Sequence, residues 1–189
     1  GKSRNLGIKK AYVELIAFLY SYDVWEKYKL IKVNDTIKLS KSDLIYHGMY
    51  YLPKKFGFIK QIIKNKSSSI NEPIYQNLLK YGNPIANSSV VIRKKKLAEI
   101  GFISEHDEKY SWEDYECWIR LSSRNNKFFF INQILGYCLV GQGRVSNVHQ
   151  SYKNCKNFMK FYRKEIAKIN ENKKRPVWIS IMYSNFFFK

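Results

Sequence analysis

Apolar residues in this chain form short continuous runs that alternate with stretches of helical spacing. The run at residues 15–19 predicts a buried strand, and the run at residues 44–51 predicts a second strand. A third strand-like stretch covers residues 128–140, with breaks expected at Asn132 and Gly136. Strands that alternate with helical segments are typical of an α/β architecture.

Helical spacing is clearest over residues 112–124. One face of this segment is expected to be buried, and it carries Tyr115, Trp118, Ile119, Leu121 and Ser122. The predicted helix opens with Glu113 and Asp114 in its first turn. The positive end of the helix dipole favours carboxylates at that place.

Shorter segments connect these elements. Residues 26–31 and 94–100 predict short helices, and a basic amphipathic helix is expected from residue 152 to about residue 169. Residues 87–93 predict a short strand or turn, and the serine run at residues 67–69 predicts a loop.

Composition and charge narrow the functional classes. The 189 residues are 45% hydrophobic and 16% aromatic, which is typical of a globular domain with a core. The formal net charge of +19 indicates an anionic partner, which is a nucleic acid, an anionic lipid surface or a phosphorylated substrate. The scattered cysteines and histidines form neither a disulfide framework nor a zinc pattern, which favours a reducing compartment. No signal peptide or bilayer-length apolar run is seen.

Four short motifs occur in a definite order. They read RNLGI at residues 4–8, FLYSYDVW at 18–25, NSSVVIR at 87–93 and WEDYECWIRL at 112–121. In this order and spacing they resemble the bacterial family 2 glycosyltransferases of the GT-A fold. That family typically reads A-R-N-x-G-I, F-L-D-x-D-D-x-W, S-S-x-V-x-R and E-D-x-x-x-W-x-R-L. The resemblance runs from Arg4 to about residue 147.

The resemblance implies an α/β fold with a GT-A-like mixed sheet flanked by helices. It also implies a fold that is N-terminally truncated relative to the family, because the usual strand-helix-strand unit that binds the nucleotide precedes the first motif. On this basis residues 1–150 are expected to form a partial glycosyltransferase domain. Residues 151–189 are expected to form a C-terminal basic helical extension.

The resemblance also implies a role for each matching residue. Asp114 would take the proton from the acceptor hydroxyl in an inverting sugar transfer, and Glu113 would support or orient it. Asp23 would hold a divalent cation, Mn²⁺ or Mg²⁺, that offsets the charge of the leaving nucleotide diphosphate. The residues expected to bind the donor or its cation are Arg4, Asn5, Tyr20, Tyr22, Asp23 and Arg144.

Structural alternatives stand beside these roles. Asp23 could be the N-cap of the following helix, Arg144 a solvated loop residue, and the acidic pair an ordinary helix start. Tyr20 and Tyr22 replace two of the three aspartates in the family's acidic motif, so Asp23 alone remains there. An inactive transferase remnant is therefore an alternative to an active enzyme.

The expected partners are a nucleotide-sugar donor and a surface-glycan or lipid-linked acceptor, such as the lipid A core of lipopolysaccharide. Basic and aromatic residues after residue 151 suit an anionic membrane surface, or equally a docking helix with a solvated basic face. The expected location is the cytoplasm, with peripheral association at the inner face of the cytoplasmic membrane. A nucleic-acid-binding module is the alternative of another class, but no recognition motif supports it and no nucleic-acid partner is expected.

Overall fold

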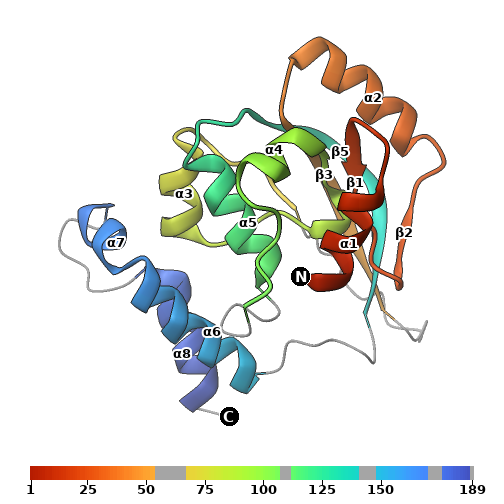
Figure 1. Cartoon of the computed structure of the whole chain (residues 1–189). Coiled ribbons are helices and arrows are strands. Elements are labelled where there is room, and N and C mark those ends of the chain that lie inside the picture. Colours follow the sequence, from red (N-terminus) through yellow and green to blue (C-terminus); the bar gives the residue numbers. More distant parts are fainter. Residues whose placement is uncertain (54–66, 107–111, 141–147, 170–175, 188–189) are drawn as a thin grey trace.

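A five-stranded mixed sheet forms the centre of the described part of the molecule (Figure 1). The computed structural model describes residues 1–53, 67–106, 112–140, 148–169 and 176–187. The sheet order is β1-β4-β3-β5-β2, with β1 at Leu15–Ala17, β2 at Asp23–Trp25, β3 at Leu44–Pro53, β4 at Val91–Arg93 and β5 at Phe128–Val140. Strands β3 and β5 pair in parallel, and the other neighbours pair antiparallel. The expected α/β fold with a mixed sheet flanked by helices is confirmed.

Strand β5 is continuous, so the predicted breaks at Asn132 and Gly136 are wrong. The irregularity appears instead as a shift in register against β3, where Gly48 pairs with Ile134. Extra residues of β5 bulge out of the ladder at this point, which bends a strand without ending it. Gly48 suits the bulge because a Cβ there would lie only 3.0 Å from the carbonyl oxygen of Gln133.

The strand β1 lies at one edge of the sheet and pairs with β4. The prediction of a buried strand over residues 15–19 is therefore wrong in its burial. Phe18 points into the core and is 6% exposed, whereas Leu19 is 49% exposed. An edge strand has solvent on one side, so a continuous apolar run at this position cannot be buried throughout.

The helices gather in separate groups around the sheet (Figure 1). Helices α6, α7 and α8 lie together on the side of α5 away from the sheet, and α2 covers the opposite end of the molecule. The bounds are α1 Lys2–Lys10, α2 Lys29–Ser40, α3 Ile74–Tyr81, α4 Lys94–Glu99, α5 Glu113–Ser122, α6 Val148–Phe161, α7 Arg163–Ile169 and α8 Val177–Phe187. A short 3₁₀ turn, η1, spans Asn87–Ser89.

Two helix predictions need correction. The helix expected at residues 26–31 begins at Lys29 and continues to Ser40. The single basic helix expected from residue 152 is two helices, because α6 ends at Phe161 and α7 begins at Arg163. The predicted strand at residues 44–51 and the predicted strand or turn at residues 87–93 are confirmed by β3 and by η1 followed by β4.

Helix α5 runs through the core, and its predicted buried face is confirmed. Trp118 and Leu121 are 0% exposed, and Ile119 is 1% exposed. The same apolar cluster includes Phe158 of α6 and Ile179 of α8, so the C-terminal helices pack against the α5 side of the molecule. Burial of these side chains stabilises each by about 1.5–3 kcal/mol, which holds the first turn of α5 in place.

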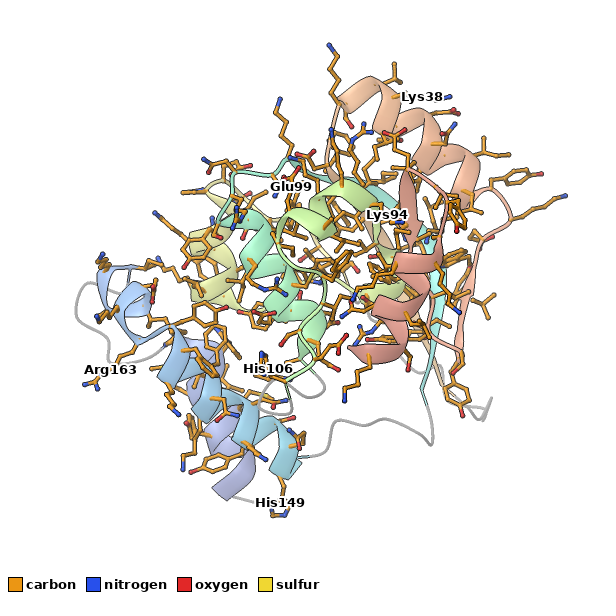
Figure 2. The ribbon with its side chains drawn as sticks, viewed as in Figure 1. Lys38, Lys94, Glu99, His106, His149 and Arg163 are labelled. Carbon is orange, nitrogen blue, oxygen red and sulfur yellow. The ribbon has the colours of Figure 1, made fainter. Side chains whose placement is uncertain are left out.

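Helix α1 is anchored at its C-terminal end by Lys94. The Lys94 ammonium donates hydrogen bonds to the carbonyl oxygens of Ala11 at 2.6 Å and Lys9 at 3.3 Å. A cation at this end complements the helix dipole. Lys94 opens α4, so this contact fixes α1 against the edge of the sheet formed by β1 and β4 (Figure 2).

None of the helices in the described ranges is both long and apolar enough to cross a membrane. Three cysteines, Cys117, Cys138 and Cys155, are buried free thiols. Burial raises the pKa of Cys117 to about 12 and that of Cys155 to about 11. A thiol in that state is protonated at neutral pH and behaves as a small apolar group.

Candidate functional site

Asp23, one of the predicted site residues, opens β2 directly after the turn that follows β1. The backbone N–H of Asp23 donates to the carbonyl oxygen of Tyr20 at 2.9 Å, and the Tyr20 N–H donates to Ser88 Oγ at 3.0 Å. Asp23 is 8% exposed, and its Oδ2 has no hydrogen-bond partner among the described residues. Asp23 is not a helix N-cap, because α2 begins later and its N-cap is Tyr28.

The second part of the site is the first turn of α5. Glu113 is 9% exposed, and its Oε1 lies 3.3 Å from Nη2 of Arg4 and 3.1 Å from the Gly1 nitrogen. Asp114 is half-buried, and its Oδ1 accepts a hydrogen bond from the Tyr115 N–H at 2.7 Å. The two carboxylates therefore differ: Glu113 is tied to α1 by a cation, whereas Asp114 follows it at the start of α5.

Tyr20 joins these two parts electrostatically. Burial of its hydroxyl end raises the pKa of Tyr20, although 41% of the whole residue is exposed. The carboxylate of Asp114 raises this pKa further, as Glu113 and Asp23 also do, and the Arg4 guanidinium lowers it. The Arg4 guanidinium carbon also lies 6.0 Å from the centre of the Tyr20 ring.

The structure thus brings five predicted site residues into one place. They come from α1, the β1–β2 turn and α5, and they are Arg4, Tyr20, Asp23, Glu113 and Asp114. We call this group the Tyr20 cluster. A neutral tyrosine hydroxyl can donate one hydrogen bond, to a carboxylate, and can accept one from a donor such as a guanidinium, so the Tyr20 hydroxyl suits a place among carboxylates and Arg4.

The other predicted donor-binding residues lie differently. Asn5 is 4% exposed and uses its amide within the fold, donating to Ile103 O at 2.7 Å and accepting from Ile103 N at 3.1 Å. Tyr22 is 60% exposed beside Asp23. Arg144 lies outside the described residues. Asn5 is thus a contact between α1 and the segment before α5, and its role toward a donor stays a prediction.

Sequence reasoning missed a buried polar group beneath the Tyr20 turn. Lys29 is 0% exposed, and its ammonium nitrogen lies 3.2 Å from Ser88 O and 3.4 Å from the centre of the Trp25 ring. Trp25 Nε1 donates to the same carbonyl oxygen at 2.7 Å. Ser88 therefore connects three segments. Its carbonyl oxygen accepts hydrogen bonds from Trp25 of β2 and Lys29 of α2, and its hydroxyl oxygen accepts one from the Tyr20 N–H. No sequence signal distinguishes Lys29 from the other lysines around it.

Burial changes the protonation of two residues in this region. It lowers the pKa of Lys29 to about 7, since a charged ammonium is poorly solvated there. Burial also lowers the pKa of His47 to about 4, with a smaller contribution from the nearby Lys29 charge. His47 is 0% exposed, and its Nε2 has no partner among the described residues. At neutral pH the His47 ring is therefore uncharged.

Asp23 is the carboxylate that would hold a cation in this site. Within the described ranges, no group of three or more His, Cys, Asp or Glu side chains could hold a metal ion. The chain itself supplies one buried, unpaired oxygen ligand at this place, Asp23 Oδ2. A divalent cation takes six or more oxygen ligands, so phosphate oxygens and water would have to complete its shell.

The basic residues of the C-terminal helices face outward. Phe158 is 6% exposed and Cys155 is 0% exposed, because both pack in the core. The exposed basic side chains on α6 and α7 include Lys153, Lys156, Lys160, Arg163, Lys164 and Lys168. Arg163 points away from the other helices (Figure 2). The apolar side of the extension is thus used within the fold, and the basic side is presented to solvent.

Neither a family model nor a curated protein matches the chain. Solved structures of TarS from S. aureus do match it. TarS 1–349 in complex with UDP-GlcNAc matches with a TM-score of 0.60 at 18% identity, over 98% of this chain and 51% of that chain. TarS 1–349 in complex with UDP matches with a TM-score of 0.54 at 18% identity, over 86% of this chain and 51% of that chain.

A further structure of S. aureus TarS matches with a TM-score of 0.53 at 18% identity, over 88% of this chain and 32% of that chain. The chain therefore spans about half or less of the length of these three structures. At this identity the similarity shows the fold alone, and that fold is shared with TarS, a glycosyltransferase. A fold alone does not define a reaction, so the chemistry must be argued from the Tyr20 cluster.

Proposed function

We propose that this chain belongs to a glycosyltransferase of the GT-A type that moves a sugar from a nucleotide-sugar donor to a surface-glycan or lipid-linked acceptor. The observation that carries the proposal is the meeting of Arg4, Tyr20, Asp23, Glu113 and Asp114 around one tyrosine hydroxyl. TarS, which shares the fold, has been solved in complex with UDP-GlcNAc and with UDP. A nucleotide-sugar donor therefore suits the fold, and it suits the cluster when a cation offsets the negative charge of the three carboxylates and the diphosphate.

In the proposed reaction, the oxygen of an acceptor hydroxyl attacks the anomeric carbon of the donor sugar. Asp114 takes the proton of that hydroxyl as the new carbon–oxygen bond forms. The bond between the anomeric carbon and the diphosphate breaks on the opposite side, so the configuration inverts. Glu113 is paired with Arg4 and therefore supports the site, and the role of the base goes to Asp114, which follows it in the first turn of α5.

The leaving diphosphate carries negative charge that the chain must offset. Arg4 Nη1 has no partner within the described residues and can donate to a phosphate oxygen. A divalent cation, Mn²⁺ or Mg²⁺, would supply further charge stabilisation when bound, with Asp23 as its ligand from this chain. The buried, unpaired Oδ2 of Asp23 supports this assignment.

A donor panel tests the proposal most directly. Purified protein is mixed with UDP-, GDP-, CDP- and dTDP-sugars, with Mn²⁺, Mg²⁺ or EDTA, and binding and release of the nucleoside diphosphate are measured. We expect one nucleotide class to bind, with tighter binding in the presence of the cation. If no donor binds under any condition, while RNA or DNA binds with a steep salt dependence, the transferase proposal is wrong.

An inactive remnant that binds a donor without transferring the sugar is the second candidate. The observation that favours it is the replacement of two motif aspartates by Tyr20 and Tyr22, which leaves Asp23 as a single carboxylate ligand. A single protein ligand holds a cation weakly. Donor binding without release of nucleoside diphosphate, in a protein that carries all of its natural sequence, would favour this candidate.

We further propose that the basic face of α6 and α7 attaches the protein to the inner face of an anionic membrane. The exposed lysines and arginines support electrostatic attachment, which contributes about 1 kcal/mol for each basic residue near the surface. Insertion is not part of the proposal, since Phe158 is already buried in the core. Vesicles with 30% phosphatidylglycerol test it. We expect sedimentation with these vesicles at low salt, none with pure phosphatidylcholine, and loss of binding in Lys153→Glu/Lys156→Glu/Lys160→Glu.

A further inference from the structure

Two buried asparagines in this chain differ in how their side-chain amides are satisfied. Asn5 is 4% exposed, and its amide makes hydrogen bonds to Ile103 and to Glu105 Oε1. Asn87 is 2% exposed, and neither its Nδ2 nor its Oδ1 has a partner among the described residues. A buried polar group without a partner costs about 1–3 kcal/mol. Burial of the Asn87 amide therefore lowers the stability of the fold, and no hydrogen bond among the described residues compensates for it.

Asn87 lies beside the turn that carries Tyr20. Its chain neighbour Ser88 accepts the hydrogen bond from the Tyr20 N–H at 3.0 Å. Its other neighbour, Ala86, packs against Cys138, and Cys138 is the partner of Asp23 in the sheet register. Asn87 is thus flanked by a direct contact with Tyr20, through Ser88, and by an indirect one with Asp23, through Cys138.

The backbone around Asn87 is held firmly. Lys29 and Trp25 both donate to Ser88 O, at 3.2 Å and 2.7 Å. On the other side, the Ser89 hydroxyl donates to Ala86 O at 2.6 Å, and the Ser89 N–H donates to the same oxygen at 2.9 Å. The unpaired amide is therefore a feature of a fixed turn, and a fixed group loses little conformational entropy when a ligand binds.

The chemistry of an amide indicates which ligand it suits. An asparagine side chain offers two N–H donors and one carbonyl acceptor and carries no charge. A phosphate group offers acceptors but no donor at neutral pH, so it would leave Asn87 Oδ1 unpaired. A sugar hydroxyl both donates and accepts, and two neighbouring hydroxyls can pair with both ends of the amide.

We propose that Asn87 binds hydroxyl groups of the donor sugar and thereby helps to select that sugar. This inference rests on the proposed transferase function and adds a residue to it. In the free protein the amide is unpaired, and the bound sugar supplies its partners. A buried polar group without a partner calls for a physical explanation, and a ligand that supplies the partner is one.

Matched binding measurements test the role of Asn87. The wild type, Asn87→Ala and Asn5→Ala are each titrated by calorimetry with UDP-, GDP-, CDP- and dTDP-sugars and with the corresponding nucleoside diphosphates. We expect Asn87→Ala to bind the preferred nucleotide sugar about 10- to 100-fold more weakly, which corresponds to losing one or two hydrogen bonds. Its affinity for the nucleoside diphosphate should change less than about twofold, because that probe has no donor sugar.

Thermal melting separates binding from folding. Asn87→Ala should melt at the same temperature as the wild type or higher, because the substitution removes a buried amide that has no partner. Asn5→Ala should melt at a lower temperature, because it breaks the hydrogen bonds to Ile103.

The outcomes are distinguishable. If the wild type binds no nucleotide sugar, the transferase proposal fails, and the role of Asn87 fails with it. If the wild type binds and Asn87→Ala keeps the same preference for the nucleotide sugar over the nucleoside diphosphate, the Asn87 inference alone is overturned. A lowered melting temperature with equal losses for both probes would make Asn87 a structural residue and would also overturn it.

Discussion

Arg4 and Glu113 connect α1 to the first turn of α5, with Nη2 of Arg4 lying 3.3 Å from Oε1 of Glu113. The pair occupies one carboxylate of the acidic motif and leaves Nη1 of Arg4 without a partner among the described residues. Two adjacent carboxylates therefore have different surroundings. Glu113 is paired with the Arg4 guanidinium, whereas the Asp114 carboxylate raises the pKa of Tyr20.

Glu113→Gln should lower the free energy of unfolding by about 1–3 kcal/mol, because the substitution removes the charge that pairs with a half-buried cation. Urea unfolding followed by circular dichroism measures the effect. Glu99→Gln is the matched control, since Glu99 pairs with Lys96 at 3.1 Å on an exposed surface. That control should change stability by less than about 0.5 kcal/mol. Equal effects in the two variants would contradict the structural role of Glu113.

Asp114→Asn should reduce sugar transfer about 10²- to 10⁴-fold, because the amide cannot take the proton of the acceptor hydroxyl. Donor affinity and melting temperature should stay close to those of the wild type. Steady-state transfer and calorimetric binding measure both quantities in a protein with all of its natural sequence. Asp35→Asn on the exposed side of α2 serves as the control. Unchanged turnover in Asp114→Asn would refute the base assignment.

Asp23→Asn should weaken the dependence of donor binding on Mn²⁺ by at least about tenfold, because an amide is a poorer ligand for a hard cation than a carboxylate. Stability should not fall, since Asp23 Oδ2 is buried and unpaired in the free protein. Titration of Mn²⁺ in the presence of the nucleoside diphosphate measures the effect, and EDTA should remove it in the wild type. An identical Mn²⁺ response in the variant would exclude Asp23 as the ligand.

Lys29→Met should change how stability depends on pH. In the wild type the folded pKa of Lys29 is about 7, below its ordinary value of 10.5. Between these pH values the unfolded chain binds the extra proton, so wild-type stability gains up to about 1.4 kcal/mol per pH unit as pH rises. Well below pH 7 both states are protonated and this gain is absent.

Lys29→Met should remove that slope between pH 7 and 10, and it should not lower stability at pH 7. Ser88 O keeps its hydrogen bond from Trp25 at 2.7 Å, so the substitution leaves that carbonyl satisfied. Urea unfolding at several pH values measures the slope. Lys32→Met, on the exposed side of the same helix, should leave the slope as in the wild type. A slope that persists in Lys29→Met would contradict the pKa shift.

Local patterns predicted several elements because the cause of each lies within a few residues. The buried face of α5 follows from apolar side chains at helical spacing. Gly101 follows the end of α4 with a φ of 74°, a conformation that glycine adopts easily. Edge and centre positions in the sheet were not predictable in the same way. The run at residues 15–19 looks like a buried strand, but only the pairing order of the sheet places it at an edge.

The sequence by itself proposed Asp23, Glu113 and Asp114 as the residues that bear the chemistry, from motif order and helix spacing, and their roles stay predictions. Only the tertiary structure decided how each side chain is held. Among the described residues it pairs Glu113 with Arg4, leaves Asp23 Oδ2 without a hydrogen-bond partner, and satisfies the Asn5 amide while leaving the Asn87 amide unsatisfied. These differences depend on contacts between segments far apart in the chain. Local spacing carries no information about such contacts, because burial and hydrogen bonding are set by the packing of the whole fold.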